Sequence, residues 1–283
     1  MKLFKNKTFL LFLPSLVFLI IPLYGLFGTI KQSLFQDGAL SLSYYEQLWL
    51  SDRFIASLGF SLNIAFLSSL LSLGIGLFIT RSCYGYLEKT IPRIIVWIPM
   101  LFPHFVWGYM VVLLLSETGV LSHALLSLGW LSDNSQFPIL TRDPKGIGII
   151  ITYVWKETPF VILMLLPVYA SVDPSYYDVV KTLGGGRWQQ FINVEWPHLN
   201  KVLMETFIII FSFVIASYEV PAFLGTSYPE MVAIVSYDWF YDGNWEDRPL
   251  AFAAMVSISL FILILAMTGF MLVNKKTWRS RRK

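Results

Sequence analysis

The sequence predicts an all-α integral membrane protein with six transmembrane helices. Only 14% of its 283 residues are charged, whereas 56% are hydrophobic. A soluble domain has about a quarter of its residues charged. The apolar residues gather in six blocks, each long enough to supply the ~20 residues with which a helix crosses a bilayer. Basic residues collect in alternate connections between these blocks, as expected when successive connections lie on opposite sides of a membrane.

We predict the spans, in order, at residues 9–30, 55–80, 94–116, 147–170, 202–225 and 250–273. The first span follows three lysines, which also suits a secretory signal peptide. However, its apolar run is longer than a typical signal core, contains Pro14 and Pro22, and has no small-x-small cleavage site in a suitable place. We therefore interpret it as a retained helix, and the chain as a single transmembrane domain over residues 1–283.

The distribution of charge predicts the orientation of the chain. Fifteen basic residues lie in the N-terminus, the second and fourth connections and the C-terminal tail, against five in the remaining connections. The positive-inside rule places the richer side, and hence both termini, in the cytoplasm. The net charge of +3 does not suggest a nucleic-acid partner, and membrane lipid is the expected surrounding. A single cysteine, Cys83, excludes a disulfide within the chain, and the three histidines show no metal-ligand spacing.

Small residues recur along one face of the second span, at spacings of three and four. They are Ser61, Ala65, Ser69, Ser72 and Gly76. Such stripes let helix backbones approach closely in lipid. We therefore expect this helix to be packed inside the bundle.

The connection at residues 171–201 has the pattern of two short helices around a glycine corner. Asp173 is a favourable N-cap, and Pro174 suits the first helical position. The first helix is predicted to run through Leu183, and Gly184 to end it in a left-handed conformation.

The second short helix of this connection is predicted from Arg187 to about Val194. It carries Trp188, Phe191 and Ile192 on one side, and Pro197 is expected to close the unit before the fifth span. Aromatic side chains on a protruding element suggest a docking surface. A loop packed against its own bundle is the alternative that the residues alone leave open.

This connection resembles the signature of the permease subunits of binding-protein-dependent ABC importers. That signature is EAA, three residues, Gly, nine residues, Ile, one residue and Leu-Pro. The chain matches the spacing at every position, with departures in residue type. The matching residues are Asp178, Val179, Val180, Gly184, Val194, Trp196 and Pro197. The six-span layout extends the resemblance over most of the chain, nearest to the polyamine and iron branch of the type I, MetI-like family.

The resemblance implies partners and a division of labour. The connection would insert a coupling helix into a cytoplasmic ABC ATPase dimer, and a second permease subunit, homologous or identical, would complete the pathway. An extracytoplasmic binding protein would deliver the solute in a bacterial inner membrane. ATP and Mg would bind the ATPase, because this chain has no phosphate-binding loop and needs no cofactor of its own. The implied coupling residues are Tyr177, Asp178, Gly184, Gly185, Arg187, Trp188 and Pro197.

Charged residues inside the spans are candidates for the solute pathway, because such charges are costly in lipid. Lys156 and Glu157 are adjacent in the fourth span, where they either line the pathway or pair within the bundle. Glu219 follows Tyr218 in the fifth span, close to Pro221, which is expected to end or bend the helix. Tyr218 and Glu219 are therefore further candidates for residues that line the pathway.

Two other function classes are weighed against the importer subunit. A membrane-embedded enzyme would need a catalytic constellation within the spans, and we find none. A stand-alone channel or secondary transporter would need no docking loop, and inverted repeats expected of several secondary transporters are not evident. The solute is expected to be small and hydrophilic. The resemblance and the acidic external loops favour a polyamine, another small cation or a metal-type ligand.

Overall fold

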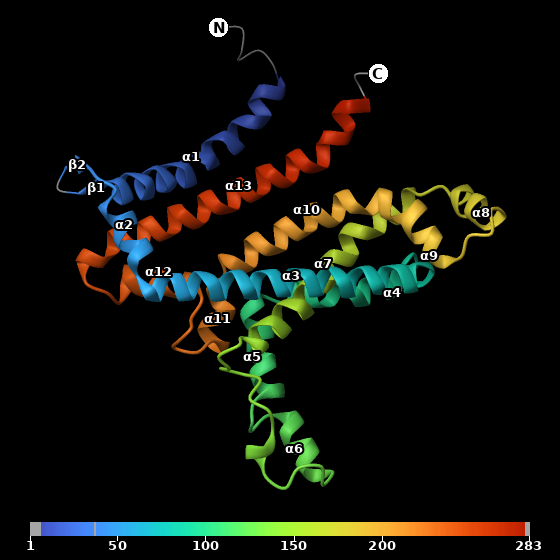
Figure 1. The fold of residues 1–283 in the computed structure, drawn as a ribbon, viewed down its shortest axis with the longest axis horizontal. Coiled ribbons are helices and arrows are strands. Elements are labelled where there is room, and N and C mark those ends of the chain that lie inside the picture. Colours follow the sequence, from blue (N-terminus) through green and yellow to red (C-terminus); the bar gives the residue numbers. More distant parts are fainter. Residues whose placement is uncertain (1–6, 37, 281–283) are drawn as a thin grey trace. The chain divides into compact units, whose positions relative to one another are not determined.

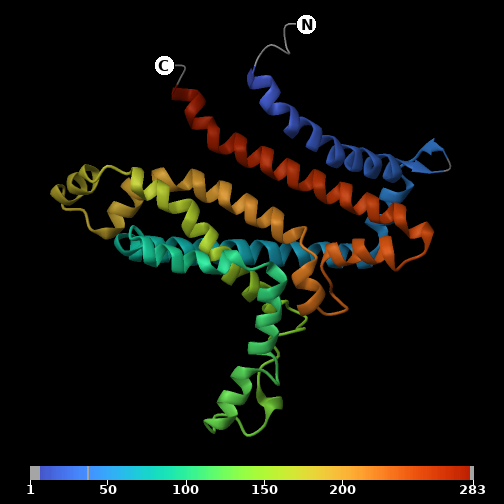
Figure 2. The same ribbon diagram turned by 180° about the vertical axis from the view of Figure 1, so that it is seen from behind.

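The computed structural model describes residues 7–36 and 38–280, and helices dominate this part of the chain. Figure 1, and Figure 2 from behind, show the order of the elements. The chain divides into two units: the first comprises the residues up to Ile55 with Val235–Phe261, and the second comprises Ala56–Ile234 with Ile262 onward. Each unit is described by itself.

The first unit begins with a long helix and a small hairpin. Its elements are α1 (Lys7–Leu34), β1 (Phe35–Gln36), β2 (Ala39–Leu40), α2 (Ser43–Leu50), the start of α3 (Asp52–Leu87), most of α12 (Val232–Tyr241), η5 (Trp245–Asp247) and the first half of α13 (Arg248–Ser280). The strands pair antiparallel. Arg53 donates to Asp238 at 2.6 Å, and the buried Phe54 ring stacks on Trp239. These contacts join the start of α3 to α12.

The second unit holds the main core. Its further elements are α4 (Thr90–Trp97), η2 (Ile98–Leu101), α5 (His104–Leu115), α6 (Val120–Ser127), η3 (Asn134–Gln136), α7 (Ile147–Ser171), α8 (Ser175–Thr182), α9 (Arg187–Gln190), η4 (Phe191–Glu195), α10 (Trp196–Ile215) and α11 (Glu219–Leu224). Ile149, Val161 and Leu165 of α7 are fully buried, as are Ile210 and Val214 of α10. The central position of α7 explains why its sequence, apart from polar residues such as Lys156 and Glu157, is apolar around the helix rather than along one stripe.

Six helical segments within the described residues are long and apolar enough to cross a membrane. This confirms the predicted fold class. The fourth span fits most closely, since α7 covers Ile147–Ser171 against the predicted 147–170. The orientation prediction depends in part on residues 1–6 and 281–283, which lie outside the described residues.

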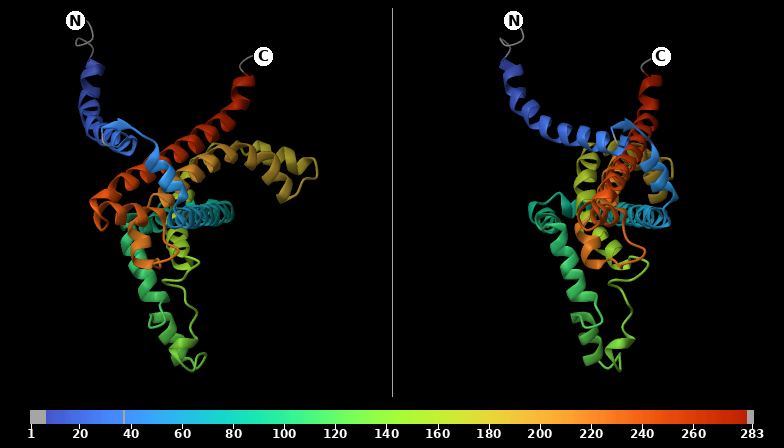
Figure 3. Two further views of the ribbon diagram at one scale, coloured as in Figure 1. Left: turned by 60° about the vertical axis from the view of Figure 1, so that its left-hand side comes forward. Right: turned by 90° about the vertical axis from the view of Figure 1, so that its left-hand side faces the viewer.

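The predicted third span, residues 94–116, is wrong as a single helix. The chain forms α4 and the 3-10 turn η2, is extended at Phe102, and starts again as α5. Pro103 explains the break, because a residue before proline is disfavoured in the helical conformation and proline has no N–H to donate. The helical segment long enough to span is His104–Ser127, formed by α5 and α6. Helix α5 packs against α7, whereas α6 extends away from the core of this unit in every view (Figure 3).

The fifth span is also interrupted, and earlier than expected. Helix α10 ends at Ile215 and α11 begins at Glu219, so the break precedes Pro221. Pro221 is the third residue of α11. A helix leaves the N–H groups of its first turn without intrahelical partners, so a proline is tolerated there.

The small-residue face of α3 is buried, which confirms the packing prediction for the second span. Ser61, Ala65, Ser69 and Ser72 are all fully buried. Gly76 continues this face, and a Cβ atom built on it would lie 2.6 Å from Val161 Cγ1. Helices α3 and α7 therefore approach each other at a point where only glycine fits.

Candidate functional site

The connection between α7 and α10, residues 172–195, has a defined structure, and we call it the corner. Asp173 Oδ1 accepts a hydrogen bond from the Ser175 N–H at 2.8 Å and so caps α8. This bond holds the pKa of Asp173 below its ordinary value. At the other end, Gly184 has a φ of +77°, as predicted. The helix thus starts and stops where the sequence indicated, within the usual uncertainty of one residue.

Two backbone hydrogen bonds close the C-terminal end of α8. The Gly184 N–H donates to Lys181 O at 2.9 Å, and the Gly185 N–H donates to Val180 O at 2.8 Å. This pair of bonds is a Schellman motif, which satisfies carbonyl groups that a helix end leaves free. The turn places α8 and α9 side by side at the end of α7 and α10 (Figure 1).

The corner presents apolar side chains to its surroundings. Leu183 is 82% exposed, and Val179 and Trp188 are also exposed. Asp178, the residue at the first signature position, is exposed and forms an ion pair with Lys181 at 3.1 Å. An exposed apolar surface with charges at its edge has the composition of a protein-docking surface.

The second half of the connection departs from the prediction. Helix α9 runs through the π turn η4 into α10 without a break, and the combined segment extends from Arg187 to Ile215. Pro197 therefore does not close the unit but lies, exposed, in the first turn of α10. The π turn just before it explains the difference, because a wider turn relieves the clash between a proline ring and the preceding carbonyls.

An arginine on α3 contacts this connection. Arg81 Nε donates to both carboxylate oxygens of Glu195, at 3.0 and 3.3 Å, and its Nη2 donates to the carbonyl oxygen of Arg187 at 2.8 Å. The guanidinium also lies over the Phe191 ring, 4.8 Å from its centroid. We call Arg81, Glu195 and Tyr169, whose hydroxyl donates to Glu195 at 2.9 Å, the inner anchor.

The inner anchor is not apparent from the sequence. There, Arg81 is one of the basic residues that set orientation, and Glu195 is a spacer in the signature. The two residues are 114 positions apart, and no sequence pattern pairs them. Tyr177 is half-buried beside this cluster, and burial, followed by the charge of Glu195, raises the pKa of its phenol, while Arg81 opposes that rise.

A second polar cluster surrounds the break between η2 and α5. Lys156 of α7 is buried, and its Nζ donates to the carbonyl oxygens of Pro99 at 3.0 Å, Met100 at 3.1 Å and Phe102. A helix end inside a membrane needs partners for its carbonyl groups, since lipid offers none. Lys156 supplies these partners at the break.

Glu157 contacts the other side of the same break. Its Oε1 lies 2.9 Å from Nε2 of His104, the first residue of α5. The His104 ring lies over Phe213 of α10, with centroids 4.4 Å apart. Close by, the Tyr153 hydroxyl and Ser217 are hydrogen-bonded at 2.6 Å. Residues of α5, α7 and α10 thus gather around the two interrupted spans.

The remaining pathway candidates lie at the break after α10. Tyr218 precedes α11 and Glu219 is its first residue, and both side chains are exposed. A carboxylate at a helix N-terminus is favoured by the helix dipole. Lys156 and Glu157 thus contact the α4–α5 connection, whereas the side chains of Tyr218 and Glu219 are exposed at the start of α11.

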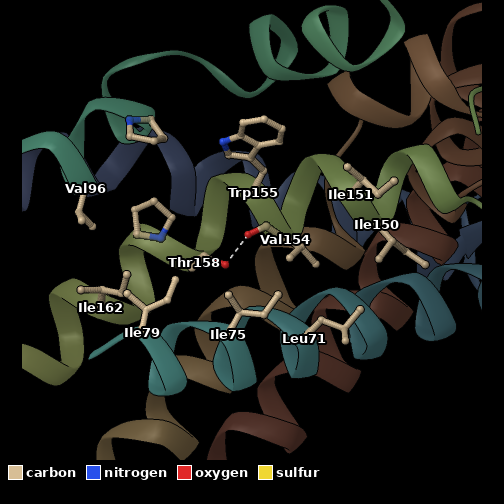
Figure 4. Close-up of a pocket in the computed structure, with 12 residues that line it drawn as sticks. Leu71, Ile75, Ile79, Val96, Ile150, Ile151, Val154, Trp155, Thr158 and Ile162 are labelled. Atoms are coloured by element: carbon tan, nitrogen blue, oxygen red, sulfur yellow. Dashed lines mark hydrogen bonds between the residues drawn. The ribbon is translucent and has the colours of Figure 1, made fainter. Parts of the chain in front are cut away.

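A cavity of about 490 Å³ opens between α3, α4 and α7 (Figure 4). Its lining is apolar: Leu71, Ile75 and Ile79 of α3 face Ile151 and Ile162 of α7. The hydrogen bond drawn there, from Thr158 to the Val154 carbonyl, remains within α7. Such a lining does not suit a hydrophilic solute, which leaves the polar cluster as the better candidate. Among the described residues, no group of three or more His, Cys, Asp or Glu side chains is placed to hold a metal ion.

Comparison with known proteins relates this geometry to a family. The model of the "Binding-protein-dependent transport system inner membrane component" family matches residues 72–279, which is more than half of the chain. The sulfate transport system permease protein CysT of Escherichia coli (strain K12) is 25% identical over 267 residues, covering 93% of this chain and 87% of that protein. The ferric transport system permease protein FbpB of Actinobacillus pleuropneumoniae is 24% identical over 215 residues.

The coverage differs between these two relatives. The match to FbpB takes up 76% of this chain but only 30% of that protein, so the chain spans about a third of its length. Among solved structures, a bacterial ABC transporter involved in the import of the acidic polysaccharide alginate superposes with a TM-score of 0.72. It is 20% identical, and the match covers 95% of each chain. This likeness shows the fold.

The extent of the family match, which includes the corner and the two interrupted spans, decides against a membrane-embedded enzyme and against a stand-alone channel or secondary transporter. The chain belongs to the binding-protein-dependent transport system inner membrane components, the multi-pass and non-catalytic permease subunits of ABC importers.

Proposed function

We propose that this chain forms half of the solute pathway of an ABC importer and couples to a cytoplasmic ATPase dimer through residues 171–201. A second permease subunit completes the pathway, and an extracytoplasmic binding protein delivers the solute. Both termini lie in the cytoplasm, on the side of the corner, in a bacterial inner membrane. ATP and Mg bind the ATPase and not this chain.

The observation that carries the coupling proposal is the apolar surface of the corner. Leu183, Val179 and Trp188 are exposed at the end of a loop whose backbone is fixed by a cap and a Schellman motif. A rigid loop that exposes apolar side chains binds a partner at low entropic cost, because little of it becomes ordered on binding. The signature spacing in the same loop favours an ATPase as that partner.

We further propose that the solute is small and hydrophilic, with a polyamine, another small cation or a metal-type ligand favoured. Glu219 and Tyr218 place a carboxylate and an aromatic ring together on an exposed face, and Glu157 and His104 lie at the neighbouring break. Carboxylates and aromatic faces both attract cations. Lys156 is assigned a structural role, since its three hydrogen bonds go to backbone carbonyls. The relatives do not indicate whether the solute is a cation or an anion, because one is named for ferric and one for sulfate transport.

A pull-down from detergent-solubilised membranes tests the coupling proposal. The tagged chain is expected to recover an ATP-hydrolysing partner, identified by mass spectrometry. Leu183→Asp puts a charge at the centre of the apolar surface and is expected to abolish recovery. Leu128→Asp is the matched control, because Leu128 is a similarly exposed leucine in the connection on the opposite side of the membrane. Recovery of the chain alone, or full recovery with Leu183→Asp, would overturn the proposal.

The solute is tested by uptake of radiolabelled spermidine, ferric iron, thiamine and sulfate in cells that express the complete transporter. Glu219→Gln is expected to reduce uptake of the transported cation at least tenfold, and Glu246→Gln, an exposed carboxylate in the last external connection, to leave it unchanged. Uptake of sulfate that is insensitive to Glu219→Gln would contradict the cation assignment while leaving the importer role intact.

A further inference from the structure

The inner anchor joins helices that the chain itself does not connect. The corner is covalently continuous with α7 on one side and with α10 on the other, through η4. Helix α3 lies a hundred residues earlier in the sequence, and its contact with the corner passes through Arg81. A displacement of the corner therefore reaches α7 and α10 through the backbone, whereas Arg81 gives the end of α3 a direct contact with the corner, in addition to the packing of α3 on α7.

Arg81 is suited to this role by the number and direction of its contacts. The Nε edge of its guanidinium faces the Glu195 carboxylate, the Nη2 group reaches the Arg187 carbonyl, and one face covers the Phe191 ring. A planar guanidinium makes such contacts in fixed relative directions, whereas a lysine ammonium is a single point charge on a flexible stem. The arginine thus fixes the orientation as well as the distance of the corner.

Glu195 makes the anchor firm because it is removed from water. It is 5% exposed, and the Tyr169 hydroxyl of α7 donates to the same oxygen that Arg81 Nε approaches most closely. The Arg81 side chain is 34% exposed, so the pair is buried on the Glu195 side only, and separating the partners would leave that carboxylate away from water without its counter-charge. The carboxylate therefore ties α3 and α7 to the base of the corner at a single point.

Glu195 lies at an irregular point of the backbone. It is the last residue of the π turn η4, between α9 and α10. A π turn inserts one residue into a helix, shifts the face on which the following side chains lie, and is frequent at functional sites. The segment that would transmit movement from α9 to α10 thus contains an irregular turn at the residue that Arg81 holds.

We propose that Arg81 is a positioning residue of the transport cycle. Through Glu195, Arg81 makes the C-terminal end of α3 move together with the corner when the two ATPase subunits close. The proposal rests on the proposed coupling function, and it adds a third helix to the two that the corner moves through its backbone. Loss of the anchor would leave an ATPase that still binds and hydrolyses ATP but no longer moves the end of α3 that carries Arg81 together with the corner.

The chain offers its own probe for this movement. Cys83 is its single cysteine, is exposed, and lies two residues after Arg81 on α3. The experiment uses the complete transporter with its ATPase, reconstituted in liposomes. The rate of Cys83 modification by a maleimide is measured with and without ATP and vanadate, on the peptide that contains Cys83, by mass spectrometry. The wild type is expected to change its labelling rate when ATP is added.

Glu195→Gln and Arg81→Ala are expected to abolish this ATP-dependent change while retaining the ATPase in the pull-down. Because removal of Arg81 leaves the buried Glu195 carboxylate without a counter-charge and can destabilise the fold, Arg81→Met combined with Glu195→Gln serves as a second variant that leaves no unpaired charge. Arg93→Ala is the control, since Arg93 lies on α4 over the Trp97 ring. It is expected to keep the wild-type response.

The outcomes separate this inference from the function on which it rests. If the double variant retains both the ATPase and the wild-type labelling response, Arg81 does not transmit movement and the inference is overturned, although coupling through the corner stands. If the wild-type chain recovers no ATPase, the coupling function itself fails. If the variants lose the response but keep ATP hydrolysis, the positioning role is supported, because a merely unfolded subunit would lose both.

Discussion

The amide N–H of Gly185 donates to the carbonyl oxygen of Val180 at 2.8 Å, and the two residues approach so closely that glycine alone fits. A Cβ atom on Gly185 would lie 2.5 Å from Val180 Cγ1 and 2.8 Å from the Val180 oxygen. This contact sets the direction in which the chain leaves α8. It makes the geometry of the corner sensitive to a single methyl group.

Gly185→Ala is therefore expected to distort the corner at a cost of about 1–3 kcal/mol, the range for overpacking a tight site. Because the distorted corner no longer fits its partner, less ATPase should be recovered in the pull-down, while insertion of the spans is unchanged. Gly186→Ala is the matched control, because its Cβ would meet only the flexible end of the Gln189 side chain, at 3.3 Å. Equal recovery by both variants would show that the corner tolerates the added methyl group.

The cap of α8 gives a second prediction. Asp173→Ala removes the acceptor of the Ser175 N–H and is expected to lower local helix stability, whereas Asp173→Asn retains an acceptor. Hydrogen exchange of the α8 amides, followed by mass spectrometry, measures the effect. The alanine variant should exchange faster than the asparagine variant, and identical protection would contradict a capping role.

The pH dependence of this cap follows from the direction of its pKa shift. The backbone hydrogen bond from Ser175 lowers the pKa of Asp173 below 3.8 in the folded chain. The contribution of the carboxylate is thus fully present above pH 3.8 and is lost only as the pH falls through the lower, folded value. The difference between the wild type and Asp173→Asn should accordingly be the same at pH 7 and pH 5.

The contact between α3 and α7 gives a third prediction. A methyl group on Gly76 would lie 2.6 Å from Val161 Cγ1, whereas one on Gly74, two residues away on the same helix, meets nothing within 4 Å. Gly76→Ala is expected to destabilise the bundle by about 1–3 kcal/mol. Gly74→Ala should have no such effect. Thermal unfolding in detergent compares the two variants, and equal midpoints would contradict the close approach of α3 and α7 at Gly76.

The break between η2 and α5 gives a fourth prediction. Lys156→Met removes the donor for three backbone carbonyls, and unpaired buried polar groups cost about 1–3 kcal/mol. The midpoint of thermal unfolding should fall clearly. Lys181→Met is the control, because Lys181 is exposed and forms its ion pair with the exposed Asp178. A midpoint for Lys156→Met equal to that of Lys181→Met would rule out the structural role of Lys156.

Patterns among residues close together in the sequence predicted the spans, the cap of α8 and the buried face of α3. Apolar blocks of sufficient length predicted six spans, and α7 agrees with its prediction to within one residue. The cap at Asp173 and the left-handed Gly184 depend on the chemistry of a few adjacent residues, and both are present in the structure. The small-residue face of α3 followed from helical periodicity, which fixes the residues that share a face.

These local patterns could not predict contacts between segments that are far apart in the sequence. The break at Phe102 and Pro103 replaced the predicted third span, and it is stable because Lys156, more than fifty residues later, satisfies its carbonyl groups. In the same way, the corner is held by Arg81 and Glu195, whose pairing no local pattern contains. Local sequence indicates which segments are apolar enough to span a membrane and which residues share a helix face, because both depend on near neighbours. Only the tertiary structure decides which buried charges meet and where a membrane helix can be interrupted, because each depends on partners brought together by folding.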